Sequence, residues 1–213
     1  MYEAGYDAVW LAEHHFSTYS VCPSVHLMAL EAAHRTRRLR IGTAVSLAAL
    51  YHPLRLAEEV ALLDVLTDGR VNWGAGRGFD PTEFEAFGVP LDETVGRFQE
   101  AAEVVLAAWA NDHLAFHGRY WDFDHVEMLP KPCQLPGPPT RVAATSLDTV
   151  SSADSTGHLI LMDPHASSSE IGAKYELYCS QLAAHAWPAP ATRLRSADRS
   201  SVDIAPPTAV LSG

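Results

Sequence analysis

Short apolar runs alternate with helix-length amphipathic segments along most of this 213-residue chain. Apolar runs of this length without strict alternation are typical of strands buried on both faces, and strands that alternate with helices predict βα units around a parallel sheet. The fold class is therefore α/β, either an open doubly wound sheet or a barrel. The expected strands lie at 7–12, 39–45, 70–76, 141–144 and 158–162, and the expected helices at 24–35, 53–67, 98–109, 148–156 and 170–184.

Two segments depart from this rhythm. The connection from about residue 113 to 140 contains five prolines and is expected to be irregular, and connections that long inside a compact domain are usually lids or functional excursions. Residues 188–213 carry 3 basic and 2 acidic groups, net +1, whereas residues 1–187 carry 12 basic and 24 acidic groups, net −12. We therefore predict one folded domain over 1–187 and a disordered or foreign tail over 188–213.

Charge and composition exclude several classes of protein. A net charge of −11 disfavours binding to phosphate backbones and to anionic lipid headgroups, so neither nucleic acid nor a membrane is an expected partner. No apolar run approaches the roughly 20 residues that span a bilayer, and the N-terminus lacks the basic region of a signal peptide. Cys22, Cys133 and Cys179 are odd in number and widely spaced, which favours reduced thiols and a cytoplasmic location.

Glu13, His14 and His15 directly follow the first expected strand, at the end where parallel α/β folds place their sites. A histidine can take or give a proton near neutral pH, and a neighbouring carboxylate can orient it. The alternative is an exposed polar loop. Adjacent side chains on an extended segment point in opposite directions, so the two histidines are not expected to share a metal ion, and no zinc-ligand spacing is present elsewhere.

Arg77 closes the glycine-rich end of the third expected strand, Gly74-Ala-Gly-Arg-Gly78, and its planar guanidinium suits a phosphate. The glycine spacing is not that of the dinucleotide fingerprint, and a tight turn with a solvent-facing arginine is the alternative. Thr145 and Ser146 end the fourth strand before a helix that contains Thr149, a natural anion site or an ordinary helix cap. Glu83, in the loop after Arg77, is either a second carboxylate near the site or a surface charge.

Taken together, these motifs resemble those of the bacterial luciferase-like, flavin-dependent monooxygenase family. The resemblance covers roughly residues 1 to 185 in order, and several agreeing motifs are more specific than any one. It implies a TIM-type (β/α)8 barrel that is incomplete, with about strands two to six present and the chain truncated at both ends. The matching segments are 5–16, 40–43, 52–59, 63–64, 68–70, 74–78, 87–88, 118–120, 129–132 and 142–146.

The resemblance also implies a cofactor site for FMN at the C-terminal ends of the strands. Arg77, Ser146 and Thr149 would hold the FMN phosphate, with Thr145 beside them. The backbone at Ala44-Val45 would lie against the isoalloxazine ring, where the family often carries a cis peptide. The deazaflavin F420 is the alternative cofactor, used by an F420-dependent oxidoreductase.

By the same resemblance, His14 would be the catalytic histidine, supported by His15 and Glu13, and Glu83 matches an acidic position after the phosphate arginine. The implied activity is a monooxygenase that uses reduced FMN and O2, through a C4a-peroxyflavin, to oxygenate a small alkanal-like substrate. A separate flavin reductase would supply the reduced FMN, and a homodimer would form through helices 24–35 and 54–67. A noncatalytic flavin-binding or partner subunit, or an inactive fragment, is the alternative from a different functional class.

Overall fold

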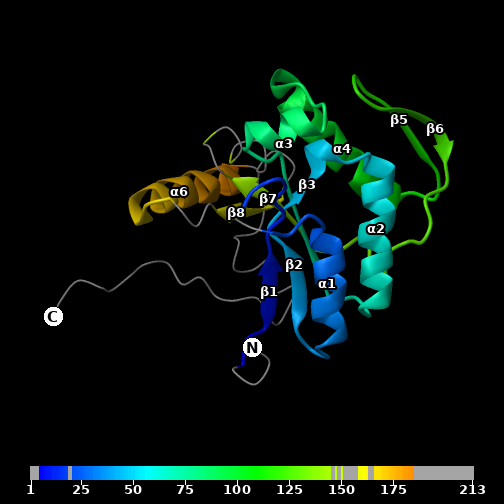
Figure 1. The fold of residues 1–213 in the computed structure, drawn as a ribbon, viewed down its shortest axis with the longest axis horizontal. Coiled ribbons are helices and arrows are strands. Elements are labelled where there is room, and N and C mark those ends of the chain that lie inside the picture. The colour runs from blue at the N-terminus through cyan, green and yellow to red at the C-terminus, as the bar shows by residue number, and fades with distance from the viewer. Residues whose placement is uncertain are drawn as a thin grey trace.

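Five parallel strands lie side by side in the order β1-β2-β4-β7-β8 in the computed structural model of the chain (Figure 1). A two-residue strand, β3 (Ser46–Leu47), also pairs with β4. The structure describes residues 5–18, 21–144, 147, 150, 158–162 and 166–184, and the predicted helix 148–156 and tail 188–213 lie outside these residues. The strand bounds are Ala8–Leu11 for β1, Arg40–Thr43 for β2, Val71–Gly76 for β4, Thr140–Ala144 for β7 and Leu159–Met162 for β8.

The order of the strands distinguishes a barrel from a doubly wound sheet. Each neighbouring pair on the path is parallel, and the strands follow one another in chain order without the reversal that a doubly wound sheet needs. Five strands of an eight-stranded barrel are therefore described, and the prediction of an incomplete TIM-type barrel is confirmed. The helices are α1 (Val25–His34), α2 (Pro53–Leu66), α3 (Pro81–Ala86), α4 (Thr94–Ala110) and α6 (Ser168–Ala184), with short 3-10 turns at Ala48–Leu50 and Leu91–Glu93.

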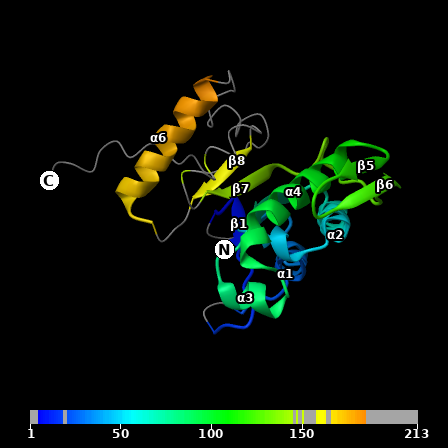
Figure 2. The ribbon, with the colours of Figure 1, turned by 90° about the horizontal axis from the view of Figure 1, so that it is seen from above.

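Local sequence signals explain where the helices begin. The Ser24 hydroxyl caps α1 by accepting the N–H of Leu27, and Pro53 and Pro81 occupy the first turns of α2 and α3, where no hydrogen bond is lost. Helices α1, α2 and α4 cover one flank of the sheet, and α6 lies by β7 and β8 (Figure 2). Their main core includes Ala29, Leu56, Val60, Trp73, Val104, Val105 and Trp109.

The two outer strands correct one expectation. Strands β1 and β8 were expected to be buried on both faces, but every residue of both strands is only partly buried. Within the described residues each of them has a strand neighbour on one side only, whereas β4, which pairs with β2, β3 and β7, is buried throughout. An edge strand has less cover than a central one, so the apolar composition alone could not distinguish the two.

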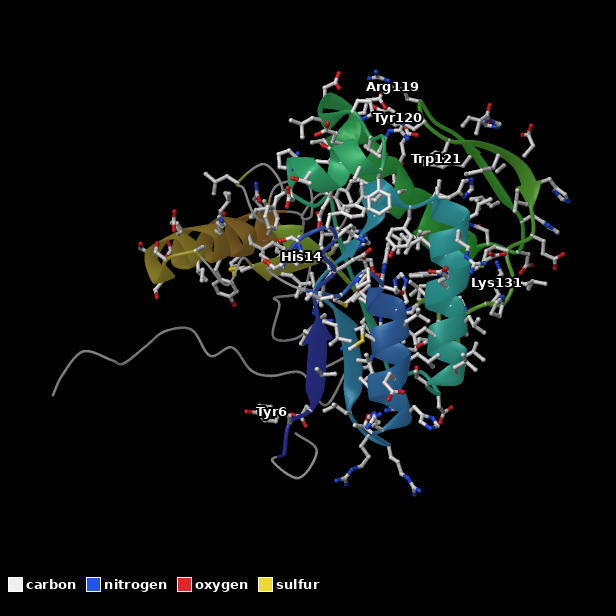
Figure 3. All side chains as sticks on the ribbon, in the orientation of Figure 1. Tyr6, His14, Arg119, Tyr120, Trp121 and Lys131 are labelled. Carbon is white, nitrogen blue, oxygen red and sulfur yellow. The ribbon has the colours of Figure 1, made fainter. Side chains whose placement is uncertain are left out.

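The connection expected to be irregular contains an antiparallel hairpin, β5 (Leu114–His117) and β6 (Asp122–Val126). One carboxylate fastens its turn to the barrel. Glu100 of α4 accepts the N–H groups of residues 119, 120 and 121 at 2.7, 2.9 and 3.3 Å (Figure 3 labels these three residues). Farther along, the Lys131 ammonium donates to the carbonyls of Ala108 and Asn111 and so caps the C-terminal end of α4.

Candidate functional site

Three of the predicted site segments lie at one edge of the sheet. Glu13 to His15 follow β1, Ala44-Val45 follow β2, and Arg77 follows β4. Because the three strands are parallel, these segments share the C-terminal edge, and Figure 3 shows His14 at the end of β1 opposite Tyr6. The other predicted residues, Thr145, Ser146 and Thr149, lie outside the described residues.

Glu13 is a buried carboxylate that joins several elements. It is 2% exposed and accepts hydrogen bonds from the His15 ring at 2.9 Å, the Tyr51 hydroxyl at 2.7 Å and the Leu47 N–H at 3.0 Å. Burial first, and then the charge of Glu13, raise the pKa of Tyr51 above its ordinary range, and the same two causes raise the pKa of the Cys22 thiol. Glu13 therefore holds the site together, and neither Tyr51 nor Leu47 was singled out from the sequence.

The two histidines bind different carboxylates, as adjacent residues on an extended segment should. His15 pairs with Glu13 through its ring, whereas Nδ1 of His14 lies 3.4 Å from Oε1 of Glu83. That same oxygen accepts the backbone N–H of His15 at 2.8 Å. Glu83 is only 1% exposed, so the first alternative holds: it is a second carboxylate beside the histidines, and it lies in helix α3 and not in a loop.

Three exposed phenylalanines surround the histidine pair. Phe79 packs edge-on against the His14 ring with the centroids 5.7 Å apart, while Phe16 and Phe87 contact the His15 ring and each other. Phe16 also adopts a positive φ of 54°, which is unusual for a bulky residue. The result is an apolar aromatic rim beside two imidazoles, a feature that the motif analysis missed although Phe16 directly follows the His-His pair.

The Ala44-Val45 peptide is cis, and the residues on either side of it are pinned by their side chains. Thr43 Oγ1 donates to the Gly74 carbonyl at 2.7 Å and accepts the Gly74 N–H at 2.8 Å. Ser46 Oγ lies 3.0 Å from Nε2 of His26. Because Thr43 and Ser46 are buried, the peptide between them is presented at the sheet edge in one fixed position.

The hydrogen bonds at Ser46 form a Ser46–His26–Glu59 chain, since Nδ1 of His26 lies 3.2 Å from the Glu59 carboxylate. The hydrogen bond from His26, assisted by Arg55, lowers the pKa of Glu59 despite its partial burial. The order of groups is that of a hydrolase triad, but Ser46 has no exposed surface and cannot reach a substrate. This chain of hydrogen bonds is therefore structural.

Arg77 is anchored by one of its five N–H donors. Its Nη1 lies 3.2 Å from Thr94 Oγ1, at the start of α4, and the Thr94 hydroxyl donates in turn to the Leu91 carbonyl at 2.8 Å. Within the described residues the guanidinium makes this hydrogen bond alone, so four donors remain for an anion. The side chain is only partly buried, which leaves it accessible at the sheet edge.

Neither a metal centre nor a membrane-spanning helix is present among the residues that the structure describes. There, no group of three or more His, Cys, Asp or Glu side chains is arranged to hold a metal ion. Over the same residues, no helix combines the length and the hydropathy required to cross a membrane. Cys22, Cys133 and Cys179 form no disulfide in the structure.

Comparison with known proteins shows which family the chain matches. The family model described as luciferase-like monooxygenase matches residues 2–210. The chain is 39% identical over 153 residues to the uncharacterized protein y4wF of Sinorhizobium fredii, covering 72% of this chain and 45% of that protein. It is 32% identical over 142 residues to the oxygenase component of the flavin-dependent trigonelline monooxygenase of Acinetobacter baylyi, covering 66% and 39%.

Two solved structures are similar to the chain. The monooxygenase RslO1 of Streptomyces bottropensis superimposes with a TM-score of 0.83 at 34% identity, over 87% of this chain and 57% of that one. The oxygenating constituent of 3,6-diketocamphane monooxygenase of Pseudomonas putida, solved with FMN, gives 0.80 at 18% identity, over 90% and 56%, and shares the fold. The chain thus spans about half the length of the relatives that it matches.

Proposed function

The chain belongs to the luciferase-like monooxygenase family, and on that premise we propose that it binds reduced FMN and uses O2 to oxygenate a small apolar organic substrate. The observation that carries the proposal is the meeting of Arg77, the Ala44-Val45 peptide and His14 at one sheet edge. Those three segments would serve the cofactor phosphate, the cofactor ring and the reacting group, in that order. The aromatic rim of Phe16, Phe79 and Phe87 supports an apolar substrate.

The residues present fit FMN. Over the residues that the structure describes, Arg77 keeps four donors uncommitted in a planar fork, the arrangement that suits a phosphate, and we propose that Thr145, Ser146 and Thr149 bind the same phosphate. The Ala44-Val45 segment is partly exposed and has small side chains, so a flat ring could lie against its backbone. The FMN-bound oxygenase of the same fold is consistent with this assignment.

When bound, reduced FMN would supply the chemistry, reacting with O2 so that one oxygen atom enters the substrate and the other leaves as water. The protein would exclude water and manage the proton. We assign proton transfer to His14, because Glu83 and Phe79 contact its ring. The His15 ring, in contrast, is bound to the buried Glu13 carboxylate. His15 and Glu13 would position it.

A noncatalytic flavin-binding subunit is the second candidate. It is compatible with the geometry, because Arg77 and the His14 ring are held by separate contacts, so an anion can bind at Arg77 without any reaction at His14. Such a subunit would retain the Arg77 anion site but would not turn over. Binding and turnover must therefore be measured separately.

Two protein partners follow from the proposal. A separate flavin reductase would deliver the reduced cofactor, as the name of the trigonelline enzyme's oxygenase component implies for that protein. A second copy of this chain would pack on the outer faces of α1 and α2, the helices after the first two strands of the sheet. Exposed Leu27 and Met28 of α1 and Leu62, Val65 and Leu66 of α2 support that interface.

Titration with FMN and with photoreduced FMN, followed by flavin fluorescence, tests the proposal. Arg77→Ala should weaken binding by about 1.5 to 3 kcal/mol, roughly 10- to 150-fold, the cost of a lost charged hydrogen bond. Arg35→Ala is the matched control, because Arg35 is an exposed arginine paired with Glu31 on α1. Absence of saturable binding, or equal affinities for the two variants, would refute the proposal, and preferential binding of F420 would reassign the cofactor.

A further inference from the structure

We propose that His26 is a positioning residue of the candidate site. It joins Glu59 of α2 to the buried Ser46, which directly follows the Ala44-Val45 peptide. In this way it holds that peptide in the place where the cofactor ring would lie. The hold on the peptide does not depend on flavin chemistry, whereas its consequence for binding rests on the proposed function.

Strand β3 needs contacts beyond its own ladder. It consists of Ser46 and Leu47 and pairs with β4, and two residues provide few ladder hydrogen bonds to fix a strand. Ser46 is fully buried, and its Oγ is hydrogen-bonded to Nε2 of His26 at 3.0 Å. The Leu47 N–H donates to Glu13 at 3.0 Å. Each residue of β3 is therefore held by one buried side chain from another part of the fold.

Both ring nitrogens of His26 are engaged. Nδ1 is hydrogen-bonded to the Glu59 carboxylate at 3.2 Å, while Nε2 bonds to Ser46. The His26 ring is 7% exposed and packs against the Tyr51 ring with the centroids 5.7 Å apart, so water competes little for either nitrogen. Loss of either partner would leave a buried ring nitrogen unpaired, which is costly. A change at Glu59 should therefore affect Ser46 through the imidazole.

Glu59 connects these hydrogen bonds to the surface of the protein. One of its oxygens, Oε2, faces His26, and the other, Oε1, accepts the Nε–H of Arg55 at 2.8 Å, one turn earlier on α2. The Glu59 side chain is 30% exposed and that of Arg55 is 68% exposed. A substitution at Glu59 therefore tests the role of His26 without altering a fully buried residue.

Amide hydrogen exchange, measured by NMR on the full-length protein without flavin, tests the inference directly. The Ala44 N–H donates to the Leu11 carbonyl at 2.6 Å, and the Trp73 N–H of β4 donates to the Pro139 carbonyl at 2.9 Å. In Ser46→Ala the exchange rate of Ala44 relative to that of Trp73 should rise about fivefold. A general loss of stability would speed both amides equally, so an unchanged ratio would overturn the inference.

Two further variants test whether the effect passes through His26. Glu59→Gln keeps the size of the side chain but removes its charge, so the exchange ratio should rise about twofold to threefold. Adding Ser46→Ala to Glu59→Gln should give the ratio of Ser46→Ala alone, whereas independent effects would multiply and would overturn the inference. Glu31→Gln is the matched control, because it also breaks an exposed glutamate–arginine pair, with Arg35 on α1, and it should leave the ratio unchanged.

A second measurement connects His26 to the cofactor. If the FMN ring lies against the Ala44-Val45 peptide, Ser46→Ala should weaken FMN binding about fivefold in a fluorescence titration, and Glu31→Gln should bind like wild type. Equal affinities of Ser46→Ala and wild type would overturn the positioning role. If wild type does not bind FMN at all, the proposed function fails, and the exchange ratios still decide whether His26 holds the peptide.

Discussion

Removal of the Glu13 carboxylate should be among the most destabilising single changes in this protein. The side chain is 2% exposed and receives three hydrogen bonds, from the His15 ring, the Tyr51 hydroxyl and the Leu47 N–H. In Glu13→Ala, all three donors lose their acceptor inside the fold. The Leu47 N–H is fixed by the backbone of β3 and cannot turn toward water.

The magnitude follows from these contacts. Each hydrogen bond to a charged group contributes about 1.5 to 3 kcal/mol, but bonds that share one acceptor are not additive, and the two side-chain donors can partly reorient. We therefore expect Glu13→Ala to lower the free energy of unfolding by about 4 kcal/mol, or Tm by roughly 8 to 16 °C for a domain of this size. Glu13→Gln, which retains one acceptor oxygen, should cost about half as much.

Urea unfolding followed by tryptophan fluorescence and far-UV circular dichroism measures this difference, with Glu103→Ala as control because Glu103 is an exposed glutamate of α4. Spectrophotometric titration adds an independent test. The charge of Glu13 contributes to the raised pKa of Tyr51, so Glu13→Gln should lower that pKa toward its ordinary value. If Glu13→Ala unfolds at the same urea concentration as Glu103→Ala, the network is not stabilising and our interpretation is wrong.

Two further predictions concern packing and assembly. Gly74→Ala should unfold the sheet edge or abolish soluble expression, because the added Cβ would overlap the Thr43 carbonyl. Gly172→Ala is the control, because this glycine lies in the open part of α6, and the change should be neutral or stabilise the protein by about 0.5 to 1 kcal/mol. Thermal unfolding compares the two variants, and equal stabilities would contradict the close approach of β2 and β4. Leu62→Glu should convert the proposed dimer to a monomer, as measured by light scattering after size-exclusion chromatography. Leu135→Glu is the control, because Leu135 is an exposed leucine outside α1 and α2, and this variant should remain a dimer. The same mass for both variants would exclude the proposed interface.

Much of the fold could be predicted because each signal was local. Helix α2 begins at Pro53 and ends just before Asp68-Gly69, and β4 occupies the Val71–Gly76 run almost as expected. The hairpin was missed because neither of its strands carries an apolar alternation: β6 reads Asp-Phe-Asp-His-Val. The hairpin turn is held by Glu100, a residue of α4 about twenty positions away. A contact between two such residues produces no periodic pattern in the sequence.

In the candidate site, too, some residues could be predicted from local motifs and others could not. Arg77 and His14 could be proposed from motifs, because each follows a recognisable strand, and the Ala44-Val45 peptide was proposed from the family resemblance. The partners of these residues could not. Glu83 reaches His15 across 68 residues of sequence, and Leu47 reaches Glu13 across 34. Only the fold decides which carboxylate of an acidic chain becomes buried.

Each of the two adjacent histidines is contacted by a different buried carboxylate. Glu13 takes the His15 ring into a network that also holds β3 and Tyr51, so that imidazole cannot change its hydrogen bond without disturbing the fold. Glu83 contacts His14 by a single ring nitrogen, and it binds the backbone of His15 with the same oxygen. A change at the His15 ring would therefore disturb a carboxylate that also binds Leu47 and Tyr51. For this reason His15→Gln should lower the free energy of unfolding in urea, and an unchanged value would show that the Glu13 network does not depend on the His15 ring.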